Sequence, residues 1–98
     1  MTQVIVRAAA RWAGDEFPGW IEVEVVYAAG QRHRVLDKVP ALTCADITAA
    51  STFPFELWLR ATCERVDGDA VVVRLADGVA TTAGVDLLRM DAAAVRRP

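Results

Sequence analysis

Apolar and polar residues alternate most strictly along two stretches of the chain, 20–28 and 55–66. The apolar positions on one side of these stretches are Ile21, Val23, Val25 and Tyr27, and then Phe55, Leu57, Leu59, Ala61 and Cys63. Successive side chains of a β-strand point to opposite faces of a sheet, so this alternation predicts two half-buried strands. A weaker alternation over 3–12 predicts another strand ahead of them.

Glycine-containing segments predict the turns between these strands. Gly30 lies in a turn after 20–28, and residues 32–37 form the return arm of a hairpin. Asp67-Gly68-Asp69 joins 55–66 to a valine-rich strand over 70–76, because glycine accepts the left-handed conformation that tight turns require. The segment 14–19 is predicted to be a connecting loop.

The segment between the two halves of the chain is the least regular. Residues 39–42 are predicted to leave the sheet, because Pro40 cannot donate a hydrogen bond to a neighbouring strand. Thr43 or Asp46 could cap a helical turn over 45–50, although no amphipathic period develops there.

The end of the chain allows two interpretations. In the first, 85–90 forms a last strand, Asp91 caps a short helix, and residues 96–98 fray. In the second, 86–96 forms one longer helix, because Leu, Arg, Met and Ala are strong helix formers. We favour the first, since every earlier segment is β.

Five or six strands at hairpin spacing, without strand–helix–strand alternation, predict a mainly β fold. We expect a small antiparallel barrel or a two-layer sheet with a short C-terminal helix. The alternative is an α+β fold with a longer C-terminal helix. The 98 residues predict a single domain over 1–98, because a chain of this size cannot bury a second core.

Charge and cysteine usage narrow the classes of partner. The net charge is −2 and Lys38 is the only lysine, whereas nucleic-acid binders carry a surplus of positive charge. No run of apolar residues is long enough to span a membrane, and the apolar run at 4–10 is interrupted by Arg7, unlike a signal peptide. We therefore expect a cytoplasmic protein whose Cys44 and Cys63 stay reduced.

No set of residues in the sequence predicts catalysis, a metal site or a cofactor. His33 is the only histidine, and neither Cys44 nor Cys63 belongs to a Cys-x-x-Cys pair. A structural zinc site needs four ligands, which these residues cannot supply. An enzyme of unknown class, acting through His33 and a carboxylate, is retained as a second alternative.

Two sets of side chains suggest binding. Large aromatics outside the main apolar face are typical of protein interfaces, so the leading hypothesis is a non-enzymatic protein-binding module of the accessory or immunity type. Its candidate residues are Trp58, Trp20, Phe17 and Arg60. The other interpretation of these aromatics is a second small core under the loops. An open sheet edge would also allow a homodimer.

The alternative function is a small β-barrel that binds nucleic acid through an arginine patch. Its candidate residues are Arg32, Arg34 and Arg60. Arg32 and Arg34 flank His33 on a predicted hairpin and project to one face, where they could hold a phosphate backbone. The competing interpretation is a solvated sheet edge whose charges discourage strand pairing.

One part of the sequence resembles a known group of proteins. It reads Phe17-Pro18-Gly19-Trp20-Ile21-Glu22-Val23-Glu24-Val25, followed by Asp37-Lys38-Val39-Pro40. The segment spans about a quarter of the chain and resembles small uncharacterised actinobacterial single-domain β proteins. The resemblance implies a single domain of about this length and assigns no functional residue.

Overall fold

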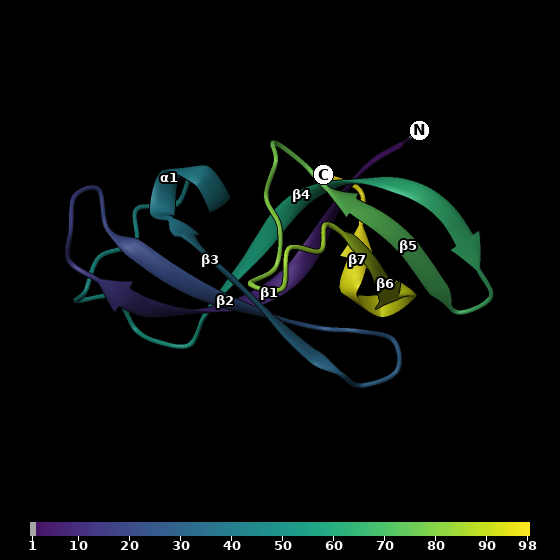
Figure 1. Cartoon of the computed structure of the whole chain (residues 1–98), viewed down its shortest axis with the longest axis horizontal. Helices are drawn as coiled ribbons and strands as arrows, with labels where there is room; N and C mark the ends of the chain where they lie inside the picture. Colours follow the sequence, from purple (N-terminus) through teal and green to yellow (C-terminus); the bar gives the residue numbers. More distant parts are fainter. Residues whose placement is uncertain (1) are drawn as a thin grey trace.

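The computed structural model describes residues 2–98, which form seven strands, one short α-helix and one 3-10 turn (Figure 1). The elements are β1 (Thr2–Gly14), β2 (Trp20–Val26), β3 (Arg32–Lys38), α1 (Val39–Leu42), β4 (Phe55–Asp67), β5 (Ala70–Leu75), β6 (Leu87–Asp91), η1 (Ala92–Ala94) and β7 (Val95–Arg96). The mainly β prediction is confirmed. The strand count exceeds the expected five or six because β7, only two residues long, also joins the sheet.

All strand pairs are antiparallel, and the sheet order is β3-β2-β1-β4-β5-β6. The long strand β1 occupies the centre. On one side it pairs with β4 from Thr2 to Ala10; on the other it pairs with β7 at Ile5 and Val6 and then with β2 from Ala9 onward. The sheet curls into a half-barrel, which Figure 1 shows from the side.

The two ends of the curled sheet approach each other. Tyr27, just beyond β2, forms an isolated bridge with Met90 on β6, and Ala28 N donates to Arg89 O at 2.9 Å. The segment between β5 and β6 crosses to β3, where Thr82 N donates to Arg34 O at 2.8 Å. These contacts cover part of the open side of the half-barrel.

The core lies on the concave face, and its residues follow the predicted alternation. Every second residue is buried over 4–10 of β1, 21–25 of β2 and 57–61 of β4, and the residues between them are exposed or half-buried. The largest fully buried side chains are Ile21, Leu88, Met90, Val6, Val23, Val25, Val35 and Val73. Burial at roughly 25 cal/mol per Å² of apolar surface makes this face the main source of stability.

The helical turn predicted over 45–50 is wrong. Thr43 Oγ1 accepts from Ala45 N at 3.0 Å and Thr48 Oγ1 accepts from Ala50 N at 3.2 Å, so the threonine hydroxyls satisfy local amides without a helix. The helical turn instead lies at α1, with Pro40 in its first turn, where a missing N–H carries no cost.

At the end of the chain, the first interpretation is confirmed and the long helix over 86–96 is wrong. Leu88 and Met90 are both fully buried, and this spacing of two residues is typical of a strand. In agreement, β6 pairs with β5. Asp91 Oδ1 then accepts from Ala93 N at 2.8 Å and caps η1. Arg96 does not fray as predicted, because β7 pairs with β1.

Candidate functional site

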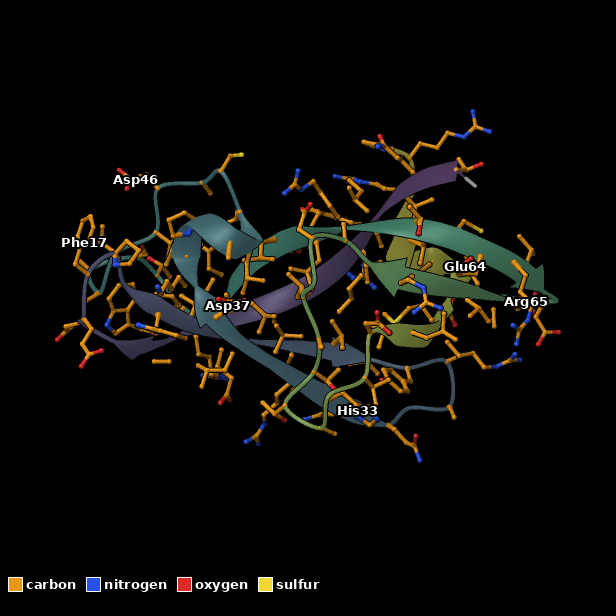
Figure 2. The ribbon with its side chains drawn as sticks, turned by 45° about the horizontal axis from the view of Figure 1, so that its top comes forward. Phe17, His33, Asp37, Asp46, Glu64 and Arg65 are labelled. Carbon is orange, nitrogen blue, oxygen red and sulfur yellow. The ribbon has the colours of Figure 1, made fainter. Side chains whose placement is uncertain are left out.

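Phe17 is the most exposed large apolar residue of the described chain. Its side chain is 96% exposed at the tip of the loop between β1 and β2, at one end of the molecule (Figure 2). This loop was predicted from Gly14, Pro18 and Gly19, and Phe17 was a candidate partner-binding residue. The sequence left open whether Phe17 is exposed or buried in a second small core; in the structure Trp12 on the preceding strand packs against the core, and Phe17 is exposed.

The loop that carries Phe17 is held at its base. Gly19 packs so closely on Trp12 that a Cβ at Gly19 would lie 2.6 Å from the ring. Trp12 Nε1 donates to Asp15 Oδ1 at 2.6 Å, and Gly19 N donates to Glu16 O at 2.6 Å. Gly19 O also accepts from Val39 N at 3.0 Å, which ties the loop to α1.

Trp20 lies beside this loop at the start of β2 and is half-buried. Lys38 Nζ lies 5.8 Å from the centroid of its ring, within range of a cation–π contact. Trp20, Ala13 and Leu36 line a shallow open hollow of about 520 Å³. Leu36 is 47% exposed, so Phe17 is not an isolated apolar group at this end.

Trp58 lies on the outer, convex face of the sheet, as its alternation predicted. It is half-buried, directly opposite Arg7 in the β1–β4 ladder. The guanidinium carbon of Arg96 lies 3.8 Å from the centroid of its ring, so one face of the indole is covered by the last strand. Trp58 is thus neither fully exposed nor enclosed in a second core of apolar side chains.

The four predicted partner-binding residues do not form one surface. Trp20 opposes Gly14 on β1, and Trp58 opposes Arg7 on the same strand. Seven residues of strand separate these two positions, which is roughly 23 Å. Phe17 and Trp20 therefore belong to one surface, and Trp58 and Arg60 to another.

The three arginines of the nucleic-acid alternative each have a carboxylate nearby. Arg32 Nε lies 3.8 Å from Glu24 Oε1, and Arg34 Nε lies 3.6 Å from Glu22 Oε1. Arg60 forms an ion pair with Asp77. Arg60 is also three strands from Arg32 and Arg34 in the sheet order, a spacing of roughly 14 Å.

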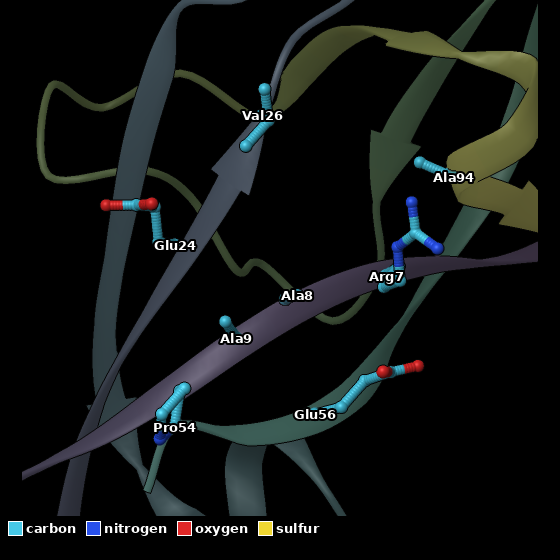
Figure 3. Close-up of a pocket in the computed structure, with 8 residues that line it drawn as sticks. All are labelled: Arg7, Ala8, Ala9, Glu24, Val26, Pro54, Glu56 and Ala94. Carbon is cyan, nitrogen blue, oxygen red and sulfur yellow. The ribbon is translucent and has the colours of Figure 1, made fainter.

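A hollow on the outer face was not predicted from the sequence. It opens where β2 turns away from β1 after Glu24 and before β7 joins at Val6, and its volume is about 320 Å³. Its lining residues are Arg7, Ala8, Ala9, Glu24, Val26, Pro54, Glu56 and Ala94 (Figure 3). No local pattern marks it, because it depends on where two strands diverge.

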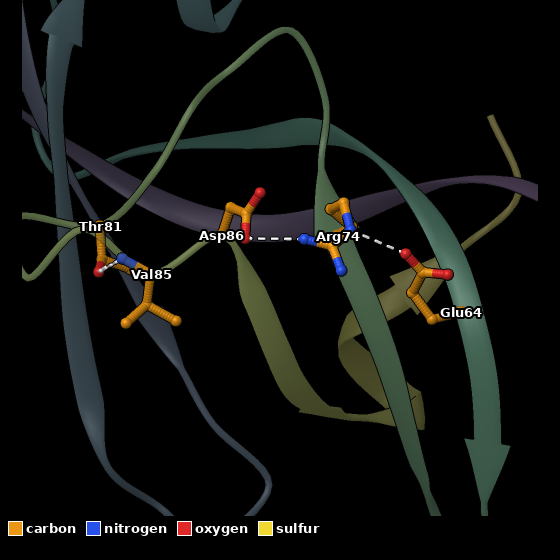
Figure 4. Close-up of polar contacts among 5 residues, drawn as sticks. All are labelled: Glu64, Arg74, Thr81, Val85 and Asp86. Carbon is orange, nitrogen blue, oxygen red and sulfur yellow. Dashed lines mark hydrogen bonds and ion pairs between the residues drawn. The ribbon is translucent and has the colours of Figure 1, made fainter.

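A polar cluster on β5 also emerges only in the structure (Figure 4). Arg74 Nε donates to Glu64 Oε1 at 2.8 Å, and Arg74 Nη1 donates to Asp86 Oδ1 at 3.0 Å. These hydrogen bonds raise the pKa of Arg74, most of all the bond to Glu64. The cluster joins β4, β5 and the segment before β6, so we assign it to the fold and not to a site.

The candidates for catalysis are dispersed. The His33 ring stacks on Tyr27 with 3.9 Å between centroids, while Cys44 is exposed and Cys63 is half-buried on β4. Among residues 2–98, no three His, Cys, Asp or Glu side chains lie close enough together to hold a metal ion. Across that same range, no helix is long and apolar enough to cross a membrane.

Comparison with protein-family models, with curated proteins and with solved structures found no match to this chain. The surfaces around Phe17 and Trp58 are therefore the features from which we infer function.

Proposed function

We propose that this chain is a non-enzymatic protein-binding module, of the accessory or immunity type, that holds its partner through the Phe17 loop. The observation that carries the proposal is the 96% exposure of the Phe17 side chain. Burying a phenylalanine contributes about 1.5–3 kcal/mol, and folding gains almost none of this here. A partner with an apolar pocket would gain it on binding.

The anchoring of the loop supports the same proposal. Binding costs free energy for every flexible side chain or loop that must be ordered. The contact of Gly19 with Trp12 and the hydrogen bonds of Asp15 and Glu16 already fix the loop in the free chain. Phe17 is thus presented by an ordered base, which lowers the entropic cost of association.

The surroundings of Phe17 resemble the layout of protein interfaces, which have an apolar centre and a polar rim. Trp20 and Leu36 add apolar area beside the loop, and Glu16 and Lys38 provide charged groups around it. Both cysteines are free thiols, which supports a cytoplasmic location for the complex.

Phe17→Ser tests the proposal. We expect the affinity of the variant for its partner from the native host to fall at least tenfold, which corresponds to about 1.4 kcal/mol. Its stability should stay within about 0.5 kcal/mol of the original, because the side chain makes almost no contact in the folded chain. Pull-down from host lysate, followed by titration of the recovered partner, measures the first effect, and urea unfolding the second.

The matched control is Val66→Ser. Val66 is also apolar and is 71% exposed, but it lies near the β4–β5 hairpin, next to Arg65 at the opposite end of the molecule (Figure 2). We expect Val66→Ser to retain the partner. Equal retention by both variants would show that Phe17 is not the anchor, and the proposal would be wrong.

A further inference from the structure

Two arginines border Trp58 on the outer face of the sheet. Arg7 stands directly across from it in the β1–β4 ladder, a position that places Cβ atoms about 4.5–5.5 Å apart. Arg96 extends from β7, and its guanidinium carbon lies 3.8 Å from the centroid of the indole ring. We refer to Arg7, Trp58, Arg96 and the adjoining hollow as the Trp58 surface.

The donors of both arginines are free for a ligand. Within residues 2–98, neither Arg7 nor Arg96 forms an ion pair, whereas neighbouring Arg60 is paired with Asp77. A guanidinium stacked on an aromatic ring keeps its N–H groups in its own plane, directed outward. Such a fork binds a carboxylate with two parallel hydrogen bonds.

The hollow beside Arg7 suits an apolar side chain. Ala9 supplies a small side chain, while Val26 and Ala94 stand on either side of the gap (Figure 3). Arg7 extends from the floor toward Ala94, so a carboxylate bound there would lie next to the hollow. One ligand segment could therefore place an acidic group and an apolar group at the same time.

We propose that the Trp58 surface binds an acidic segment of a partner protein, with a carboxylate on Arg7 and Arg96 and an apolar side chain in the hollow. The proposal adds a second contact region to the protein-binding function inferred from Phe17, but it rests on different residues. A nucleic acid fits less well. A continuous phosphate backbone would place negative charge next to Glu24 and Glu56 in the hollow, where the proposed ligand places an apolar side chain and keeps its carboxylate at the two arginines.

The test is a titration of the isotope-labelled full chain with a blocked Glu-Glu-Leu-Glu-Glu peptide, followed by NMR at about 0.15 M salt, where the Debye length is about 8 Å. We expect saturable shifts at the Trp58 indole and at the amides of Arg7 and Arg96. Arg7→Glu should weaken binding at least tenfold. Arg96→Lys keeps the charge but loses the planar stack, so it should weaken binding less than Arg96→Glu.

Arg11→Glu is the matched control for Arg7→Glu. Arg11 is exposed on the same face of β1 as Arg7 and, among the described residues, also forms no ion pair. It lies four residues further along, at a distance of roughly 13 Å. We expect its affinity for the peptide to stay within about twofold, since only long-range charge changes.

Several outcomes would overturn the proposal. These are the absence of binding, shifts spread over the whole chain, equal losses for Arg7→Glu and Arg11→Glu, and equal binding of a Lys-Lys-Leu-Lys-Lys peptide. Tighter binding of a thymidine oligonucleotide at these residues would replace it with the nucleic-acid function. Phe17→Ser should leave peptide binding unchanged, so either proposal can fail without the other.

Discussion

Gly19 sets the geometry of the Phe17 loop through its lack of a side chain. Its φ of +97° lies in the left-handed region that favours glycine, and its Cα approaches the ring of Trp12. Gly30 shares the positive φ, at +87°, but a Cβ there would meet nothing within 4 Å. A comparison of substitutions at the two glycines therefore separates the free-energy cost of positive φ from the cost of a clash with Trp12.

We predict that Gly19→Ala destabilises the fold by at least about 1 kcal/mol more than Gly30→Ala. Both variants place a side chain at positive φ, which costs roughly 1–2 kcal/mol, but only alanine at position 19 also collides with Trp12. Urea unfolding of the two variants measures the difference. Equal losses would mean that the Trp12 ring shifts without cost and does not hold the loop.

At the scale of elements, the segment between β5 and β6 is fixed by a few hydrogen bonds. Thr81 N donates to Val85 O at 2.8 Å, and the Thr81 hydroxyl accepts from Val85 N at 3.2 Å (Figure 4). Thr81 is buried, while the next residue, Thr82, is exposed and bonds to β3 only through its amide. The turn at 81–85 thus holds the segment against β3.

We predict that Thr81→Val loosens this segment. The valine keeps the shape of the side chain but removes the acceptor of Val85 N, a loss of about 1 kcal/mol. The protection factor of the amide at position 82, which corrects for the intrinsic exchange rate of each variant, should fall about fivefold. Thr82→Val is the control, because it leaves every backbone hydrogen bond in place. Unchanged exchange in Thr81→Val would show that the hydroxyl does not hold the turn.

Strands with a regular alternation of apolar and polar residues could be predicted from the sequence, and elements without such a pattern could not. The alternation at 20–28 and 55–66 placed β2 and β4 within two residues of their ends. A strand of two residues such as β7 has no period, so Arg96 was predicted to fray. The hollow beside Arg7 and the stacking of Arg96 on Trp58 both follow from β7, which explains why neither could be predicted.

At the scale of the whole molecule, the fold separates its two binding surfaces. The molecule measures about 40 × 24 × 23 Å, and β1 runs from the Trp58 surface to the Phe17 loop. Sites more than about 10 Å apart with no shared contacts respond to mutation independently. A single partner would have to span about 23 Å to touch both, so each surface can be tested in the absence of the other.

The closure of the half-barrel depends on Tyr27, whose bridge to Met90 joins the two ends of the sheet. Within residues 2–98, the buried Tyr27 hydroxyl has no hydrogen-bond partner. A buried hydroxyl without a partner costs free energy relative to water. We therefore predict that Tyr27→Phe stabilises the fold by up to about 1 kcal/mol while keeping the stack on His33.

The pH dependence of Tyr27→Phe gives an independent measurement. Burial raises the pKa of Tyr27 above its ordinary value of 10.0, so the unfolded chain ionises first as the pH rises. In the original chain, the Tyr27 hydroxyl therefore does not lower the free energy of unfolding by ionising below pH 10. Above pH 10 the free energy of unfolding falls, until the pH passes the pKa of Tyr27 in the folded chain. Tyr27→Phe has no hydroxyl to ionise, so the difference in free energy of unfolding between this variant and the original chain should grow above pH 10.

Tyr27 is the only tyrosine, so tyrosinate absorbance follows this ionisation directly. A less stable variant, or an advantage that shrinks above pH 10, would show that the hydroxyl finds a partner in solution.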